Sequence, residues 1–234
     1  MRKCMLACVP VFVLVLMLSA ASAMAAGEEA TRVGAAADVM NQIMEIPEKS
    51  IPPAMLAEAQ GLVIVPGVVK VGLVVGGQYG RGVLVVREKD GSWSEPVFVT
   101  LTSGSVGWQI GAESTDFILV FKNRKGIDGI LKGKYTLGAD VAVAAGPVGR
   151  RAEAATDVKL AAEIYSYSRN RGLFAGVSLE GSSLQVDDAA DAAFYGRKGI
   201  HASEIVAGKG MTSPAAAEKL QKALARHTRP AQNG

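Results

Sequence analysis

Hydrophobic and polar positions follow two different periods along this chain. Between residues 28 and 45 the apolar side chains recur at helical spacing, and Pro47 ends the pattern, which predicts an amphipathic helix. From Leu62 onward the apolar positions gather in short β-branched runs separated by glycines, which is typical of an antiparallel meander. The pattern therefore predicts an α+β fold, with an antiparallel β-rich sheet or partial barrel and helices at its N-terminal and C-terminal ends.

Four shorter helices are indicated by residues that favour helix ends. Proline suits the first turn of a helix, a carboxylate caps its free amides, and glycine often follows its last turn. Asp187 and Asp188, for example, are placed to cap a helix that runs through Tyr195. The predicted short helices cover residues 53–59, 127–131, 188–195 and 214–227.

Turn signals connect the predicted strands. The clearest hairpin spans residues 82–101, where Asp90-Gly91 supplies the positive backbone angles of a tight turn between two apolar runs. A second strand pair is predicted within residues 162–179. No low-complexity linker interrupts residues 61–196, so we predict one β-rich unit rather than two domains.

Residues 1–25 have the layout of a secretory signal peptide, with two basic residues, an apolar run over residues 9–18 and then small residues. We expect cleavage after Ala23 or Ala25. One competing interpretation is a retained anchor, although the apolar run is shorter than the ~20 residues that span a bilayer. The other is lipidation at Cys8, although that cysteine precedes the apolar run instead of following it.

Loss of this segment would change the chemistry that the chain offers. Cys4 and Cys8 are its two cysteines, so the mature chain would have neither a disulfide nor thiol chemistry. The formal net charge of +3 would fall to +1 without Arg2 and Lys3. A charge this small creates no global field toward nucleic acid or an anionic membrane, so anion binding must come from local clusters.

Basic residues do form local clusters, and the richest places five cations and one acid, Asp128, within thirteen positions. Near an anionic surface each such cation contributes about 1 kcal/mol to binding; the competing interpretation is a solvated loop. We expect Trp93 to be exposed at a hairpin tip as an interfacial anchor, and Trp108 to lie in the core or a pocket wall. The predicted lipid-binding residues are Lys122, Arg124, Lys125, Lys132, Lys134, Arg150, Arg151, Arg169, Arg171 and Trp93.

The sequence offers little for catalysis or metal binding. His201 and His227 are its two histidines, they lack HExxH spacing, and the mature chain would lack cysteine. No G-x-S-x-G elbow occurs, and the glycine-rich residues 76–82 lie between strands instead of opening a helix. We therefore predict a protein that is not an enzyme and has no metal and no cofactor.

Several long motifs occur in one order: GLVIVPGVVKVGLVVGGQYGRGVLVVR, DGSWSEPVFVTLTSGSVGWQIGAESTDFILVF, LGADVAVAAGPVGR, EIYSYSRNRGLFAGVSLEG and AFYG. In this order they resemble the SYLF domain of bacterial lipid-binding proteins, which is related to yeast actin-binding proteins. The resemblance covers residues 28–208, and residues 209–234 would form a C-terminal helix and tail. It implies a non-catalytic domain that binds phospholipid at a membrane surface of the cell envelope.

The resemblance also bears on partners. It implies an anionic phospholipid or membrane surface as partner. Export from the cytoplasm argues against nucleic acid, and actin is not expected to meet a protein secreted across the inner membrane into the periplasm or envelope. Eukaryotic members use a basic amphipathic helix near the start of the domain, whereas the helix at residues 28–45 has Arg32 as its one cation, so we predict that its apolar stripe packs in the core. The competing hypothesis is a periplasmic scaffold that binds a protein or glycan.

Overall fold

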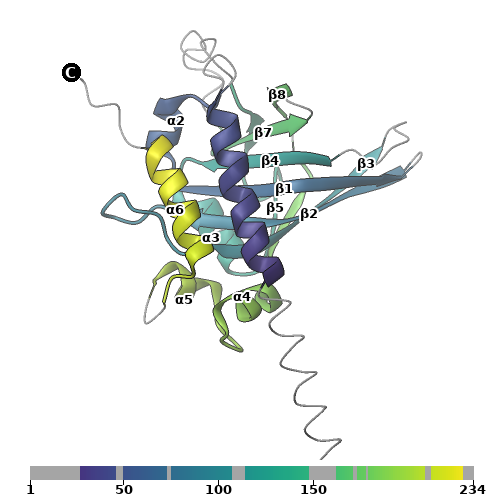
Figure 1. Ribbon diagram of the computed structural model, residues 1–234. Helices are drawn as coiled ribbons and strands as arrows, with labels where there is room; N and C mark the ends of the chain where they lie inside the picture. The colour runs from purple at the N-terminus through teal and green to yellow at the C-terminus, as the bar shows by residue number, and fades with distance from the viewer. Residues whose placement is uncertain are drawn as a thin grey trace, which may run out of the picture.

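The computed structural model describes residues 27–45, 50–72, 75–106, 114–147, 162–170, 173–177, 179–208 and 212–228. These residues form one curled sheet with helices against both of its faces (Figure 1). The expected signal peptide, with Cys4 and Cys8, lies outside the described residues. No helix in the described part of the chain is long and apolar enough to cross a membrane.

The sheet has nine strands among the described residues, in the order β5-β9-β3-β2-β1-β4-β7-β6, with β8 paired to β7. All pairs are antiparallel except β6 with β7. The predicted β-rich partial barrel is therefore confirmed. The strands are β1 (Gly61–Gly72), β2 (Val75–Val86), β3 (Val97–Val106), β4 (Ser114–Phe121), β5 (Lys134–Thr136), β6 (Val143–Ala145), β7 (Ile164–Asn170), β8 (Leu173–Gly176) and β9 (Ser183–Val186).

Six helices occur in the described part of the chain: the N-terminal helix (residues 27–44), α2 (Pro53–Glu58), α3 (Arg124–Leu131), α4 (Asp188–Tyr195), α5 (Ala202–Val206) and α6 (Ala215–Thr228). Five of them confirm the helices that the sequence predicts. The exception is α5, which was not predicted: it has five residues and no side-chain cap, so it leaves almost no local signal.

Strands β1, β2 and β4 are buried on both faces along part of their length, which explains the uninterrupted apolar runs at residues 62–65, 83–86 and 117–121. Along β1, Leu62 and Ile64 face one core, and Val63 and Val65 face the other. The first core lies beneath the N-terminal helix, α2, α4 and α6. The second is covered by α3, α5 and the short strands β5 and β9.

The N-terminal helix and α6 lie side by side over the first core, purple and yellow in Figure 1. Lys219 Nζ donates to Asp38 Oδ1 at 2.9 Å, and His227 Nε2 lies 3.0 Å from Asn41 Oδ1. The apolar stripe of the N-terminal helix is buried against the sheet, as predicted. The two ends of the described chain therefore close the same core.

Strand β1 runs through a segment that the sequence pattern divides into two runs at Pro66-Gly67. The strand continues across it because a bulge absorbs the break, with the pairing register to β4 shifting between Val65 and Val68. Gly67 has φ of 61°, and its amide donates to Asp116 Oδ1 at 2.9 Å. A side chain from β4 thus replaces a missing ladder bond.

The predicted hairpin joins β2 to β3 and is confirmed. The amide of Gly91 donates to the Glu88 carbonyl at 3.0 Å, and Gly91 has φ of 85°. Arg87 then forms an isolated bridge with Trp93. The arrangement is a short turn closed by a left-handed glycine, which suits the twist of the flanking strands.

A buried carboxyl group attaches α4 to the sheet. Asp191 is fully buried, and its Oδ1 accepts the amide of Phe98 at 2.8 Å. Burial raises the pKa of Asp191 to about 8, and the nearby carboxylates of Asp187, Asp188 and Glu29 add to the rise. At neutral pH this side chain is therefore mostly protonated.

The free energy of unfolding should depend on pH because Asp191 loses its proton at a higher pH in the folded state than in the unfolded state. Because the folded-state pKa of Asp191 is above its unfolded value, its contribution to the free energy of unfolding is complete below pH ~4 and is lost as pH rises to ~8. Asp191→Asn imitates the protonated acid, so we expect the variant to gain stability over wild type by up to ~1.4 kcal/mol per pH unit across that window. Urea unfolding at several pH values checks this, and a difference independent of pH would show an ionised Asp191.

Close approach of β1 and β2 gives a second test. A Cβ at Gly82 would lie 2.8 Å from Val65 Cα and closer still to the Ile64 carbonyl oxygen. We expect Gly82→Ala to lower the free energy of unfolding by about 1–3 kcal/mol through overpacking. Gly104→Ala on β3, where a Cβ meets nothing within 4 Å, is the matched control and should change it by less than ~0.5 kcal/mol. Equal effects in chemical denaturation would contradict the close packing.

Candidate functional site

Helix α3 organises the richest basic cluster of the chain. Asn123 caps it by accepting the Lys125 amide at 3.2 Å. After its last residue, Leu131, the Lys132 amide donates to the Gly129 carbonyl at 3.3 Å and the Gly133 amide to the Ile130 carbonyl at 2.9 Å. Ile127 and Ile130 are fully buried in the second core. Because these isoleucines hold one face of α3 inward, its charged residues lie on the outer face.

The α3 basic segment is defined here as Lys122, Arg124, Lys125, Lys132 and Lys134. Lys125, Lys132 and Lys134 are exposed, and Lys122 and Arg124 are half-buried. Lys125 Nζ lies 3.9 Å from Glu163 Oε1, which is a long separation for an ion pair, and the Lys125 side chain is 71% exposed. The structure therefore brings these five predicted residues together on one short helix and its flanks.

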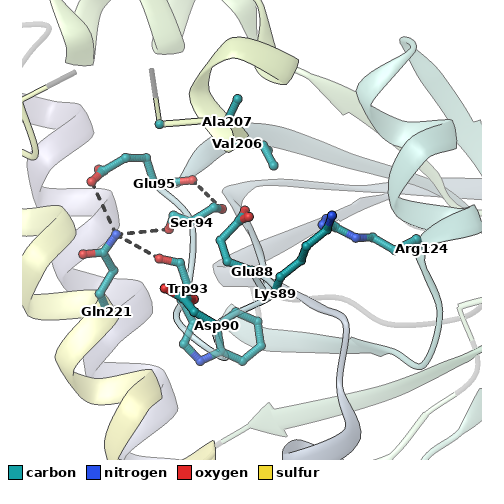
Figure 2. A pocket seen from close by; sticks show the side chains of 11 residues that line it. Glu88, Lys89, Asp90, Trp93, Ser94, Glu95, Arg124, Val206, Ala207 and Gln221 are labelled. Atoms are coloured by element: carbon teal, nitrogen blue, oxygen red, sulfur yellow. Dashed lines mark hydrogen bonds between the residues drawn. The ribbon is translucent and has the colours of Figure 1, made fainter. Parts of the chain in front are cut away.

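A pocket of about 500 Å³ adjoins this segment, between the β2–β3 loop, α3, α5 and α6. Figure 2 shows Glu88, Lys89 and Arg124 pointing toward the same space, with Glu95 and Gln221 on the other side. Gln221 Nε2 donates to the carbonyls of Trp93 and Ser94, both at 3.2 Å, and lies 3.4 Å from Glu95 Oε1. Arg124 thus belongs both to the basic segment and to the pocket wall.

Two residues that line this pocket each have one carboxylate oxygen that is buried without a hydrogen-bond partner: Oε1 of Glu88 and Oε2 of Glu95. Neither Lys89 nor Arg124 forms an ion pair with any carboxylate in the described part of the chain. An unpaired buried acceptor is unusual, because each costs about 1–3 kcal/mol of desolvation. The pocket therefore holds charges of both signs that do not satisfy one another.

Of the four arginines predicted to bind lipid, Arg169 is the one among the described residues, and it does not lie with the α3 basic segment. Arg169 on β7 pairs with Asp116, with Nη2 at 2.7 Å and Nε at 3.0 Å from Oδ2. Asp116 lies five residues before Phe121, where β4 ends, so ~17 Å of extended strand separates this pair from α3. Arg150, Arg151 and Arg171 lie outside the described residues.

Trp93 is not exposed at the hairpin tip, and that expectation was wrong. Its side chain is 5% exposed, its Nε1 donates to Thr228 Oγ1 at 3.0 Å, and the Arg87 guanidinium lies 4.5 Å from its ring centroid. Burial occurs because α6 packs over the hairpin, which local sequence does not reveal. Trp108 lies outside the described residues.

Arg87 is a structural residue that the sequence reasoning did not single out. Its Nε donates to the Ala59 carbonyl at 2.8 Å and its Nη2 to the Leu56 carbonyl at 2.9 Å, at the C-terminal end of α2. Burial lowers the pKa of this guanidinium, since no anion opposes the desolvation. The sequence analysis did not single out the pocket residues Glu88, Lys89 and Glu95 either. The pattern that could have identified them is the high proportion of charged residues in REKDGSWSE around the predicted turn.

Side chains that ligate metals do not gather in the described part of the chain. No group of three or more His, Cys, Asp or Glu side chains among the described residues is placed to hold a metal ion. Burial lowers the pKa of His227, which lies beside Asn41. His201 is exposed at the start of α5.

Comparison with known proteins supplies the family. Residues 102–227 match the model of the Ysc84 family, described as Las17-binding protein actin regulator. The chain is 41% identical over 180 residues to an SH3 domain-containing protein of Schizosaccharomyces pombe, covering 76% of this chain and 41% of that protein. It is 36% identical over 179 residues to SH3 domain-containing YSC84-like protein 1 of Xenopus laevis, covering 76% and 53%.

A third relative is Protein YSC84 of Saccharomyces cerevisiae, 38% identical over 172 residues, which cover 72% of this chain and 36% of the yeast protein. The chain thus spans between about a third and about half of the length of these three curated relatives. The similarity concerns the part of each relative that this chain matches.

The ion pair between Arg169 and Asp116 should stabilise the folded protein. Its side chains are 26% and 15% exposed, so Arg169→Gln should lower the free energy of unfolding by about 1–3 kcal/mol, the cost of a broken hydrogen bond to a charged group. Arg197→Gln is the control, because it breaks a pair with Glu204 whose side chains are 46% and 45% exposed, and such pairs contribute less than ~1 kcal/mol. Denaturant titration measures both, and a loss no larger for Arg169→Gln than for the control would oppose a structural role.

Proposed function

We propose, from the premise that this chain belongs to the Ysc84 (SYLF) family, that it is a non-catalytic phospholipid-binding domain acting at a membrane surface of the cell envelope. The observation that carries the proposal is the α3 basic segment. It presents three exposed lysines on an element whose apolar face is held in the core. Near an anionic surface such cations contribute about 1 kcal/mol each.

The N-terminal helix is a poor alternative contact for an anionic membrane. Its apolar residues are buried in the first core, so they are not available to enter a lipid surface. Its arginine, Arg32, pairs with Glu28 and Glu29 of the same helix. The helix therefore offers neither a free apolar stripe nor an unpaired cation, and this supports α3 as the membrane-facing element.

We also propose export across the inner membrane and residence in the periplasm or at the envelope. The support is the basic, apolar and small-residue order of the first 25 residues. The family description names Las17 and actin regulation, and these words apply to the family's eukaryotic relatives. For this chain we propose a binding role, as in the family, and we do not extend Las17 binding or actin regulation to it.

Vesicle flotation at low salt tests the lipid proposal. The chain should float with vesicles that contain an anionic phospholipid and much less with neutral phosphatidylcholine vesicles. Replacing Lys125, Lys132 and Lys134 by Ser should lower the partition coefficient by about 100-fold, since three cations contribute about 3 kcal/mol together. The remaining binding should depend less on salt concentration.

The control removes the same charge elsewhere. Lys198, Lys219 and Lys222 are exposed, and the two on α6 pair with Asp38 and Glu218. Replacing these three by Ser should lower the partition coefficient far less than the α3 variant. An equal loss would show that net charge, rather than α3, attracts the membrane, and no flotation of wild type with anionic vesicles would refute the lipid proposal.

A further inference from the structure

We propose that β1 and β2 form a second membrane contact, in which Val69 and Tyr79 enter the interfacial layer of a phospholipid bilayer. This inference rests on the proposed lipid-binding function and adds an apolar contact to the electrostatic one at α3. Phe121, which precedes α3, pairs with Gly61 at the start of β1, and Val69 lies eight residues farther along that strand. About 26 Å of extended strand therefore separates the two contacts, and each can be tested without altering the other.

Val69 and Tyr79 are the two large apolar side chains that are exposed in the described part of the chain, by 41% and 51%. They are direct cross-strand partners on β1 and β2, so their side chains lie next to each other on one face of the sheet. Their neighbours in the same row are Ser114 on β4 and Thr102 on β3, which are exposed as well. We call these four residues the uncharged row.

The uncharged row is exposed because it lies beside the helices that cover the first core. Side chains alternate between the two faces of a strand, and Val83 of β2 faces the first core, so Arg81 and Tyr79 lie on that face too. Arg81 bonds to Glu28 at the start of the N-terminal helix. Tyr79 is two residues nearer the end of the ribbon, where Figure 1 shows β1 and β2 extending past that helix.

The same three strands continue past the uncharged row as a ribbon. Pairing of β1 with β2 reaches Gly72 and Gly76, and pairing of β2 with β3 reaches Val75 and Val106, whereas the described pairing of β1 with β4 ends at Val69. Figure 1 shows this ribbon projecting beyond β4. Open sheet edges do not occur in the hydrocarbon of a bilayer, so we place the contact in the interfacial layer, where water still serves the backbone.

The charges of these strands suit an anionic bilayer surface. No aspartate or glutamate occurs within residues 59–87, and Lys70 is the one charged residue of residues 68–80. Asp116 on the neighbouring strand β4 is paired with Arg169, which neutralises it. Anionic headgroups therefore meet no unpaired carboxylate from these strands. Tyrosine also suits the interfacial layer, because it combines an apolar ring with a polar hydroxyl.

A second copy of this chain would be a poorer occupant of the row. A stable protein interface buries about 800 Å² on each partner and involves roughly 20–30 residues a side. The uncharged row offers two large apolar side chains in the described part of the chain. A bilayer requires no matching surface of that size, because each apolar group that enters it contributes separately to binding.

Vesicle flotation of row variants tests the contact. Val69→Ser combined with Tyr79→Ser should lower the partition coefficient on vesicles of phosphatidylglycerol and phosphatidylcholine by about tenfold, because less apolar surface enters the bilayer. The ratio should be similar in low and high salt, since salt screens charges rather than apolar contacts. Val69→Leu combined with Tyr79→Phe keeps the apolar surface and should bind within about twofold of wild type. Equal binding of the serine variant and wild type would overturn the proposal.

A fluorescent label measures entry into the bilayer directly, and it serves if the serine variant does not fold. With Cys4→Ser and Cys8→Ser the full chain has no other cysteine, so Tyr79→Cys can carry a single nitrobenzoxadiazole group. Its emission should rise and shift to shorter wavelength when the vesicles are added, because the group leaves water. Glu58→Cys, exposed on α2, is the control and should not respond. Unchanged emission at position 79 would contradict entry into the bilayer.

The remaining outcomes separate this contact from the α3 surface and from self-association. Flotation of wild type with anionic vesicles but no label response at position 79 would overturn this contact and leave the α3 proposal standing. A label response to phosphatidylcholine vesicles with no preference for anionic ones would support this contact and refute attraction by α3. Sedimentation without lipid should give a monomer, and a dimer that the serine variant loses would assign the row to a second copy and overturn the proposal.

Discussion

The need to cover both faces of one sheet governs this structure. The central strands β1, β2 and β4 are apolar on both sides, and an exposed face would cost roughly 25 cal/mol for each Å² of apolar surface left in water. The N-terminal helix and α6 close one core, although they come from opposite ends of the described chain. Helix α3 helps to close the other, and its exposed lysines follow from the burial of Ile127 and Ile130.

Polar side chains then attach the covering layers to the sheet. Arg81 on β2 bonds to Glu28 at 2.9 Å and to Glu29 and Asp187 at 3.3 Å each, and so links the N-terminal helix to the start of α4. Burial raises the pKa of Glu29, and the two arginines beside it oppose that rise. Because apolar packing has little directional preference, these bonds help to define how each helix is placed on the sheet.

The proposed membrane surface adjoins a pocket, and one residue belongs to both. Arg124 is on α3 with the exposed lysines and also lines the pocket that the hairpin loop and α6 complete. The lysines would attract an anionic surface over a Debye length of ~10 Å, with little selectivity among headgroups.

The sequence by itself determined most of the elements of this protein. The apolar periods predicted the strands and the first helix, the carboxylates at residues 187 and 188 predicted α4, and Gly91 predicted the hairpin turn, because these signals act between near neighbours. Only the tertiary structure decided which distant side chains meet. Trp93 bonds Thr228, 135 positions away, and Arg169 pairs with Asp116 instead of joining the α3 basic segment. Such contacts depend on strand register and on which helix covers which face, and these follow from the packing of the whole core rather than from any local pattern.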